Sequence, residues 1–140
     1  MTRKESRTNA FMLLFSLYAN NDLDIDSIDL EDEGVLEKDE FCNDLIEKTT
    51  AHLTEIDAAI SEHLQGWTLE RLPKTSLAIL RLSAAQLLYM PDIPTGVVIS
   101  EAVELAKHFG SSNDYVFING ALGSFEKSLN RPERESNAKQ

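Results

Sequence analysis

The stretch from Val97 to Phe125 constrains the fold of this chain most, because it contains two helical patterns joined at one glycine. Apolar residues recur at helical spacing on both sides of that glycine, at Val98, Ala102, Leu105 and Phe109 and then at Ile118, Ala121, Leu122, Phe125 and Leu129. We expect Gly110 to close the first helix in the left-handed conformation, and residues 111–114 to offer side-chain oxygens to the amides of the second. The stretch therefore predicts a tight corner between two helices that each pack on one side only.

Chain length and helix-breaking residues predict a single all-α domain. With 140 residues, the chain is long enough to bury about two-thirds of its unfolded surface without disulfides or a metal. Seven helical segments, separated by proline and glycine corners and with no convincing strand between them, are typical of an all-α fold. Trp67 is expected to fill a joint between the N-terminal and C-terminal helices, with stacking on a base as the alternative. We expect the domain to span residues 1–132 and the polar tail, 133–140, to fray.

The net charge of -11 is concentrated in one segment. Residues 21–47 carry twelve acidic side chains and a single basic one, Lys38, whereas the rest of the chain carries twelve of each. The composition of residues 20–40 is typical of a solvated connector, with an acidic docking patch as the alternative. Because salt screens exposed charges over about 8–10 Å, a local basic patch elsewhere can still attract nucleic acid.

The first helix has an aromatic edge that runs into cationic residues. On a helical wheel, one sector of about 80° contains Lys4, Arg7, Phe11, Phe15 and Tyr18. Arginine and lysine contact phosphates, and an aromatic ring stacks on an unpaired base for roughly 1–3 kcal/mol, so this edge suits single-stranded RNA. The alternative is that the three rings only widen the buried face of the helix.

No catalytic, metal-binding or cofactor-binding motif is found in the sequence. The one cysteine, Cys42, cannot form an intrachain disulfide, and we expect a buried apolar role for it in a reducing cytoplasm. The three histidines have no cysteine or carboxylate partner at ligand spacing, so no metal site is predicted. Neither a glycine-rich phosphate loop nor a segment of transmembrane length is found. We therefore expect a soluble, cytoplasmic protein that uses no cofactor and is not an enzyme.

Four segments carry the most specific signal in the sequence. They are the basic-then-apolar first helix, WTLERLPKTSLAILRL at 67–82, ISEAVELAK with HFG at 99–110, and FINGAL at 117–122. In this order they resemble the NusB family of bacterial transcription antitermination factors, over most of the chain outside roughly residues 20–40. The chain departs from the usual family residues at Ser76, where many members have an acidic residue, at Gln86, a usual glutamate, and at Ser100, a usual asparagine.

This resemblance implies a seven-helix fold of two packed three-helix bundles, about residues 1–66 and 67–130. It also implies binding to boxA, a short single-stranded RNA element of ribosomal RNA leader transcripts, together with a small-subunit ribosomal protein, NusE. The pair is expected to help RNA polymerase pass terminators, and some relatives form homodimers. The main alternative is an acidic, all-helical adaptor that binds proteins but not RNA.

The resemblance also assigns candidate site residues. The RNA-binding set is Arg3, Lys4, Arg7, Phe15, Tyr18, Asn113 and Phe117, and the partner-binding set is Arg71, Lys74, Ser76 and Arg81. Asn113 stands where some relatives have an aspartate implicated in antitermination; it can hydrogen-bond a base edge but lacks the charge. Ser76 in place of an acidic residue would remove one ion pair with the partner. The resulting hypothesis is that the basic N-terminus and Phe117 line one RNA-binding face.

Overall fold

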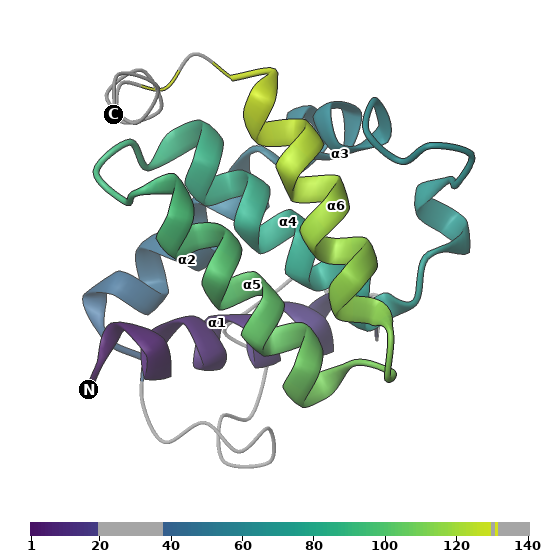
Figure 1. The fold of residues 1–140 in the computed structure, drawn as a ribbon. Coiled ribbons are helices and arrows are strands. Elements are labelled where there is room, and N and C mark those ends of the chain that lie inside the picture. Colours follow the sequence, from purple (N-terminus) through teal and green to yellow (C-terminus); the bar gives the residue numbers. More distant parts are fainter. Residues whose placement is uncertain (20–37, 130, 132–140) are drawn as a thin grey trace.

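The computed structural model describes residues 1–19, 38–129 and 131. Within these residues the chain is all-helical and has no strand, which confirms the predicted fold class. Six α-helices and one short 3₁₀ helix follow each other: α1 (Arg3–Ala19), α2 (Glu40–Ala51), α3 (Leu53–Ser61), η2 (Leu69–Arg71), α4 (Lys74–Tyr89), α5 (Thr95–Phe109) and α6 (Asp114–Lys127) (Figure 1). Most of the predicted acidic connector and the polar tail lie outside the described residues.

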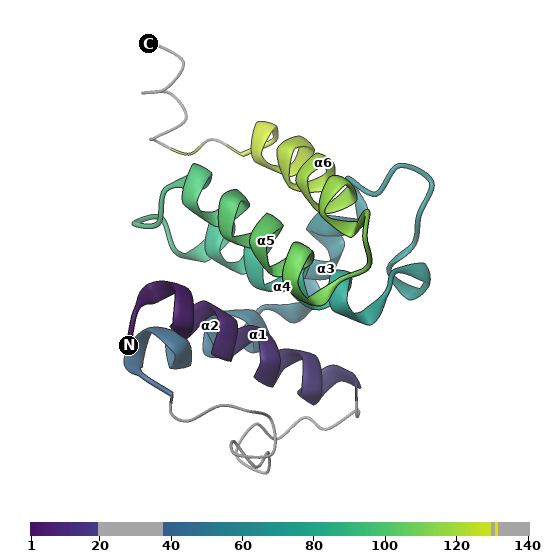
Figure 2. The ribbon, with the colours of Figure 1, turned by 60° about the horizontal axis from the view of Figure 1, so that its bottom comes forward.

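Helix α4 lies at the centre of the fold, where it contacts each of the other five α-helices of the described chain. Its sequence explains this position, because apolar and small residues occur on every side of the helix. Helices α1 and α2 pack on one side of α4, and α5 and α6 pack on the other (Figure 2). The seven-helix arrangement of two three-helix bundles remains a prediction.

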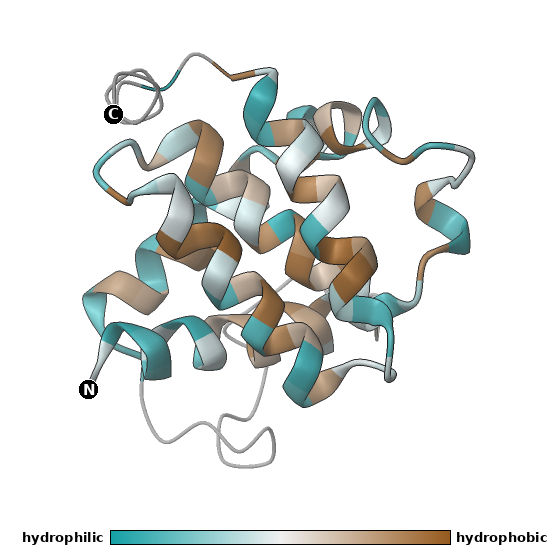
Figure 3. Ribbon diagram, viewed as in Figure 1, coloured by the Kyte–Doolittle hydropathy of each residue, from teal (hydrophilic) through white to brown (hydrophobic). Residues whose placement is uncertain are grey.

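Helices α5 and α6 are amphipathic, as their sequence pattern predicts. Hydrophobic and hydrophilic residues alternate along both ribbons (Figure 3), and their buried positions include Val98, Leu105, Ile118 and Leu122. The buried residues of all six helices form one hydrophobic core, in which Cys42 is fully buried. Burial raises the pKa of the Cys42 thiol to about 11, so the thiol is neutral at physiological pH. No helix of the described chain is long and apolar enough to cross a membrane.

The corner between α5 and α6 forms where it was predicted, but its geometry differs from the prediction. Gly110 has φ -93° and ψ -178°, which is extended backbone and not the left-handed conformation. Asn113 makes no side-chain cap, and the carboxylate of Asp114 instead accepts a hydrogen bond from the amide of Ser111 at 2.8 Å. A Cβ atom on Gly110 would lie 2.7 Å from the carbonyl oxygen of Ala106 and 2.9 Å from Oδ2 of Asp114. The glycine is therefore required for close approach and not for its φ angle.

The prediction that Trp67 fills an internal joint is wrong. Its side chain is 52% exposed and meets the ring of Phe117 edge-on, with 6.3 Å between the centroids. Two leucines near it in the sequence, Leu64 and Leu72, are buried instead. Gly66, with φ +85°, is the left-handed residue that turns the chain just before the tryptophan.

Candidate nucleic-acid interface

The predicted site residues fall on two ends of the molecule. The C-terminal half of α1 and the first turns of α4 and α6 lie at one end, at the right of Figures 1 and 2. The first turn of α1 lies at the opposite end, beside α2 and the connection between α4 and α5. The first turn of α1 is therefore separated from the first turn of α6, and the hypothesis that the basic N-terminus and Phe117 line one RNA-binding face stays a prediction. We call the two parts the ring end (Phe15, Tyr18, Trp67, Lys74, Phe117) and the arginine end (Arg3, Arg7, Phe41 and residues 90–94).

At the ring end, aromatic and cationic side chains share a hollow of about 260 Å³. Phe15 and Tyr18 line it from α1, and Lys74 and Arg81 line it from α4. The guanidinium of Arg81 lies 4.8 Å from the centroid of the Tyr18 ring and donates two hydrogen bonds to Asp57, at 2.9 and 2.8 Å. No carboxylate lines this hollow among the described residues. Lys74 is exposed, so its charge is available to an anionic ligand.

A second hollow at the ring end, of about 340 Å³, has aromatic walls and no Asp, Glu, Lys or Arg among the described residues that line it. It lies between α6 and the segment that follows α3, and its walls include Trp67, Phe117 and the 58% exposed Val116. The histidine, His63, is held by a hydrogen bond between its Nδ1 and the hydroxyl of Ser124 at 2.8 Å. Such a surface offers ring faces for stacking and few fixed charges.

A series of rings extends from α1 to the corner between α5 and α6. Phe11 stacks on Phe15 at 6.0 Å between centroids and contacts Phe109 at 4.9 Å. Beyond the corner, the ammonium group of Lys107 lies 5.1 Å from the centroid of the Tyr115 ring, and Asn113 is exposed on the corner itself. The sequence reasoning did not single out Lys107 or Tyr115 as site residues, and it gave base stacking by Trp67 only as the alternative. The only sequence feature that could have indicated this contact is the spacing of Lys107 and Tyr115 on either side of Gly110.

Burial divides the three predicted N-terminal cations. Arg3 and Lys4 are exposed, whereas Arg7 is only 5% exposed and its Nε donates a 3.0 Å hydrogen bond to Oε1 of Gln86. Burial also lowers the pKa of Arg7. Arg7 is therefore largely buried, and its assignment to the RNA-binding set stays a prediction. The helical wheel placed it at the edge of the apolar stripe, but α2 and α4 pack against that edge.

Lys4 lies in a different hollow from the two arginines. That hollow, of about 250 Å³, is also lined by Glu101, Glu104, His108 and Phe109. The two carboxylates reduce the attraction of this surface for phosphate, because like charges there oppose an anionic ligand.

The predicted partner-binding residues also differ in exposure. Arg71 and Lys74 are exposed, Arg81 is held by Asp57, and Ser76 is only 2% exposed inside the fold. Ser76 is therefore not available for a direct contact with a partner in this conformation. Lys74 lies beside Phe15 and Tyr18, so residues assigned to the RNA and to the protein partner share one surface.

Comparison with known proteins gives one consistent family. The NusB family model matches residues 4–127. The transcription antitermination protein NusB of Lysinibacillus sphaericus is 41% identical over 125 residues, which cover 89% of this chain and 97% of that protein. The corresponding NusB of Alkaliphilus oremlandii is 38% identical over 128 residues, covering 89% and 93%.

Solved structures give the same result. T. maritima NusB superposes with a TM-score of 0.83 at 33% identity, covering 98% of each chain. A chain in the crystal structure of the antitermination factors NusB and NusE in complex with dsRNA has a TM-score of 0.78 at 25% identity. That match covers 91% of this chain and 97% of the other.

Proposed function

The chain belongs to the NusB family, and we propose that it is an RNA-binding transcription antitermination factor that acts together with the small-subunit ribosomal protein NusE. The observation that carries the proposal is the likeness over nearly the full length to a chain from a complex of NusB, NusE and dsRNA. The RNA of this proposal is boxA-type single-stranded RNA in ribosomal RNA leader transcripts. The complex that it forms joins RNA polymerase in the cytoplasm, and no catalytic step is required.

The RNA surface of this proposal is the ring end. Single-stranded RNA is bound by rings that stack on bases and by cations that follow the backbone. Phe15, Tyr18, Trp67 and Phe117 supply the rings there, and Lys74 supplies an exposed charge. Arg71, at the end of η2 and three positions before Lys74, is exposed as well. Arg3 and Lys4 lie at the other end of α1, so they contact the same RNA only if it crosses the length of that helix.

Net acidity explains why a partner is needed. Half of the 24 acidic residues lie in residues 21–47, and the total charge of -11 repels a polyanion at long range. A basic ribosomal protein bound next to the ring end would offset that repulsion and raise the rate of association. The chain alone is therefore a weak RNA binder in this proposal, and the pair is a stronger one.

A salt series with a fluorescent boxA-type RNA oligomer tests the proposal. We expect log K to fall linearly with log salt, with a slope of about -0.7 per phosphate contact on single-stranded RNA, and the affinity to rise when the ribosomal partner is added. Lys74→Gln and Arg71→Gln each remove a contact and make the slope shallower by about 0.7, because one fewer counterion is released. Arg3→Gln and Lys4→Gln are matched controls that leave the slope almost unchanged.

The competing function, an acidic adaptor that binds only proteins, gives a different outcome. It predicts no RNA binding with or without the ribosomal partner, or weak binding that salt does not change. A mass measurement on the same samples distinguishes a monomer and a pair with NusE from a homodimer, which would change the surface available to RNA.

A further inference from the structure

The hollow of about 340 Å³ at the ring end, which we call the indole hollow, is built around the only tryptophan of the chain. The side chain of Trp67 is half exposed, although tryptophan is highly buried on average. The rings of Trp67 and Phe117 meet at 64° and form adjoining walls, and the exposed Val116 extends the same apolar surface. A contiguous apolar surface of this kind, unlike a single exposed side chain, marks a binding site.

The indole hollow also has a polar wall, formed by His63 and Ser124. The hydroxyl of Ser124 lies 2.8 Å from Nδ1 of His63 and meets no other acceptor among the described residues. It therefore donates its proton to Nδ1, and the neutral ring carries its own proton on Nε2. The ring packs edge-on against Phe125, with 5.4 Å between the centroids, which holds its plane. Nε2 is thus a hydrogen-bond donor that no other described residue uses.

Gly120 keeps the indole hollow open on the side of α6. A Cβ atom at this position would meet no atom within 4 Å, and the residue is exposed. Glycine is unfavourable inside a helix, and neither a positive φ angle nor a close neighbour requires it here. Any larger side chain would enter the hollow without displacing an atom of the chain. The position therefore allows the hollow to be filled without disturbing the fold.

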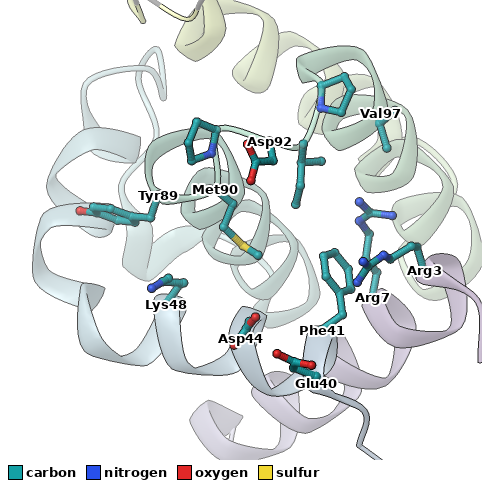
Figure 4. Close-up of a pocket in the computed structure, with 13 residues that line it drawn as sticks. Arg3, Arg7, Glu40, Phe41, Asp44, Lys48, Tyr89, Met90, Asp92 and Val97 are labelled. Carbon is teal, nitrogen blue, oxygen red and sulfur yellow. The ribbon is translucent and has the colours of Figure 1, made fainter.

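Charge distinguishes the indole hollow from the larger hollow at the arginine end. That hollow, of about 610 Å³, has charged walls of both signs, which include Arg3, Arg7, Lys48, Glu40, Asp44 and Asp92 (Figure 4). No Asp, Glu, Lys or Arg lines the indole hollow among the described residues. A ligand in the indole hollow is therefore held by stacking, shape and hydrogen bonds. These walls favour a flat, neutral group over a phosphate or a charged side chain.

We propose that the indole hollow holds one unpaired nucleobase, which stacks on Trp67 and accepts a hydrogen bond from Nε2 of His63. Every base has acceptor atoms at its edge and a flat face that stacks on an indole. Phe117 joins this hollow to the RNA surface of the proposed function, on which the inference rests, because its ring forms a wall of the hollow. The base in the hollow would thus be a neighbour of one that contacts Phe117 from outside.

The single tryptophan allows a direct test in the complex with the ribosomal partner. The chain is labelled with 5-fluorotryptophan and the partner is left unlabelled, so that the ¹⁹F spectrum contains one resonance, that of Trp67. A boxA-type RNA oligomer should shift this resonance saturably, at the concentrations at which fluorescence anisotropy shows binding. Gly120→Leu fills the hollow and should abolish the shift caused by RNA and weaken the affinity about tenfold, within the range for loss of one stacked base.

Gly123→Leu is the matched control. Gly123 is also a glycine of α6 whose added Cβ would meet no atom within 4 Å, but it does not line the hollow. The shift and the affinity of this variant should equal those of the unmodified chain. A further variant, His63→Phe, keeps a ring against Phe125 but removes the donor, and should weaken the oligomer about fivefold. Thermal unfolding is expected to show that all three variants are folded.

The possible failures have different meanings. If anisotropy shows no binding of the oligomer to the pair, the proposed function fails and this inference fails with it. RNA binding that leaves the Trp67 resonance unchanged, or that is equally strong in Gly120→Leu and Gly123→Leu, would overturn this inference alone. A saturable shift caused by the ribosomal partner, with no further shift when RNA is added, would assign the hollow to that protein and also overturn the inference.

Discussion

Phe117→Leu and Phe15→Leu each lower the affinity of the chain, bound to its ribosomal partner, for a boxA-type RNA oligomer by a factor of about 5 to 150. This range corresponds to the roughly 1–3 kcal/mol that base stacking on an aromatic ring contributes. Both rings are half-buried at the ring end, so leucine preserves their packing against the core while it removes the surface on which a base can stack. Fluorescence anisotropy at a fixed salt concentration measures the change.

Phe41→Leu is the control for this experiment. Phe41 is also a half-buried ring in contact with arginine, but it lies at the arginine end. We expect the RNA affinity of this variant to equal that of the unmodified chain, and thermal unfolding to confirm that all three variants are folded. If Phe41→Leu weakened RNA binding more than Phe117→Leu, the surface assignment would be reversed.

Gly110→Ala destabilises the chain by about 1–3 kcal/mol, because the added methyl group overpacks the corner between α5 and α6. The methyl carbon would lie 2.7 Å from the backbone oxygen of Ala106, which cannot move without distorting the end of α5. It would also lie 2.9 Å from Oδ2 of Asp114, whose hydrogen bond to Ser111 holds the corner. Urea unfolding, followed by the helical circular dichroism signal, measures the loss as a lower midpoint.

Gly120→Ala is the matched comparison on the next helix. A Cβ atom at Gly120 would meet no atom within 4 Å. The residue lies in the middle of α6 and faces solvent. Alanine at such a position should stabilise the chain by about 0.5–1 kcal/mol, because it reduces the entropy of the unfolded state and favours the helix. Two substitutions of the same kind are thus expected to have opposite signs. A loss of stability at both positions would mean that the close contacts at Gly110 are not what the alanine disturbs.

The sequence pattern predicted the all-helical class and the position of α5 and α6, but not the contacts between helices. Amphipathic periodicity located α5 and α6 and the corner that joins them, because each helix packs on one side only. The same reasoning placed Gly110 in a left-handed conformation, as helix ends often require, but the contact of Asp114 with the corner allows an extended one. The common preference of helix ends for a left-handed glycine does not apply at this corner, where the side chain of Asp114 makes a specific contact. The periodicity of apolar residues does not reveal such a contact.

The site residues show the same limit. Arg7 was expected on a cationic edge and Ser76 on a partner surface, yet both are buried because helices distant in sequence cover them. Lys74 and Tyr18 are 56 positions apart in the chain, and only the fold brings them into one hollow. Conversely, Trp67 was expected inside because it is large and apolar, and it is exposed beside Phe117. A family resemblance assigns candidate site residues by their position in the sequence. Whether their side chains are exposed depends on how the other helices pack around α4.

The two ends of the molecule therefore have different chemistry. The ring end combines exposed cations with half-buried rings and suits RNA in the proposed function. The arginine end places two guanidinium groups near one ring, in a hollow that is also lined by Glu40, Asp44, Asp92 and Lys48.

Photochemical crosslinking tests the central claim, that RNA lies at the ring end, most directly. A boxA-type oligomer carrying 4-thiouridine is bound to the chain and its ribosomal partner, irradiated, and the crosslinked residues are identified by mass spectrometry. We expect crosslinks at Phe15, Tyr18, Trp67 and Phe117. Crosslinks confined to Arg3, Lys4 and Phe41 would contradict it.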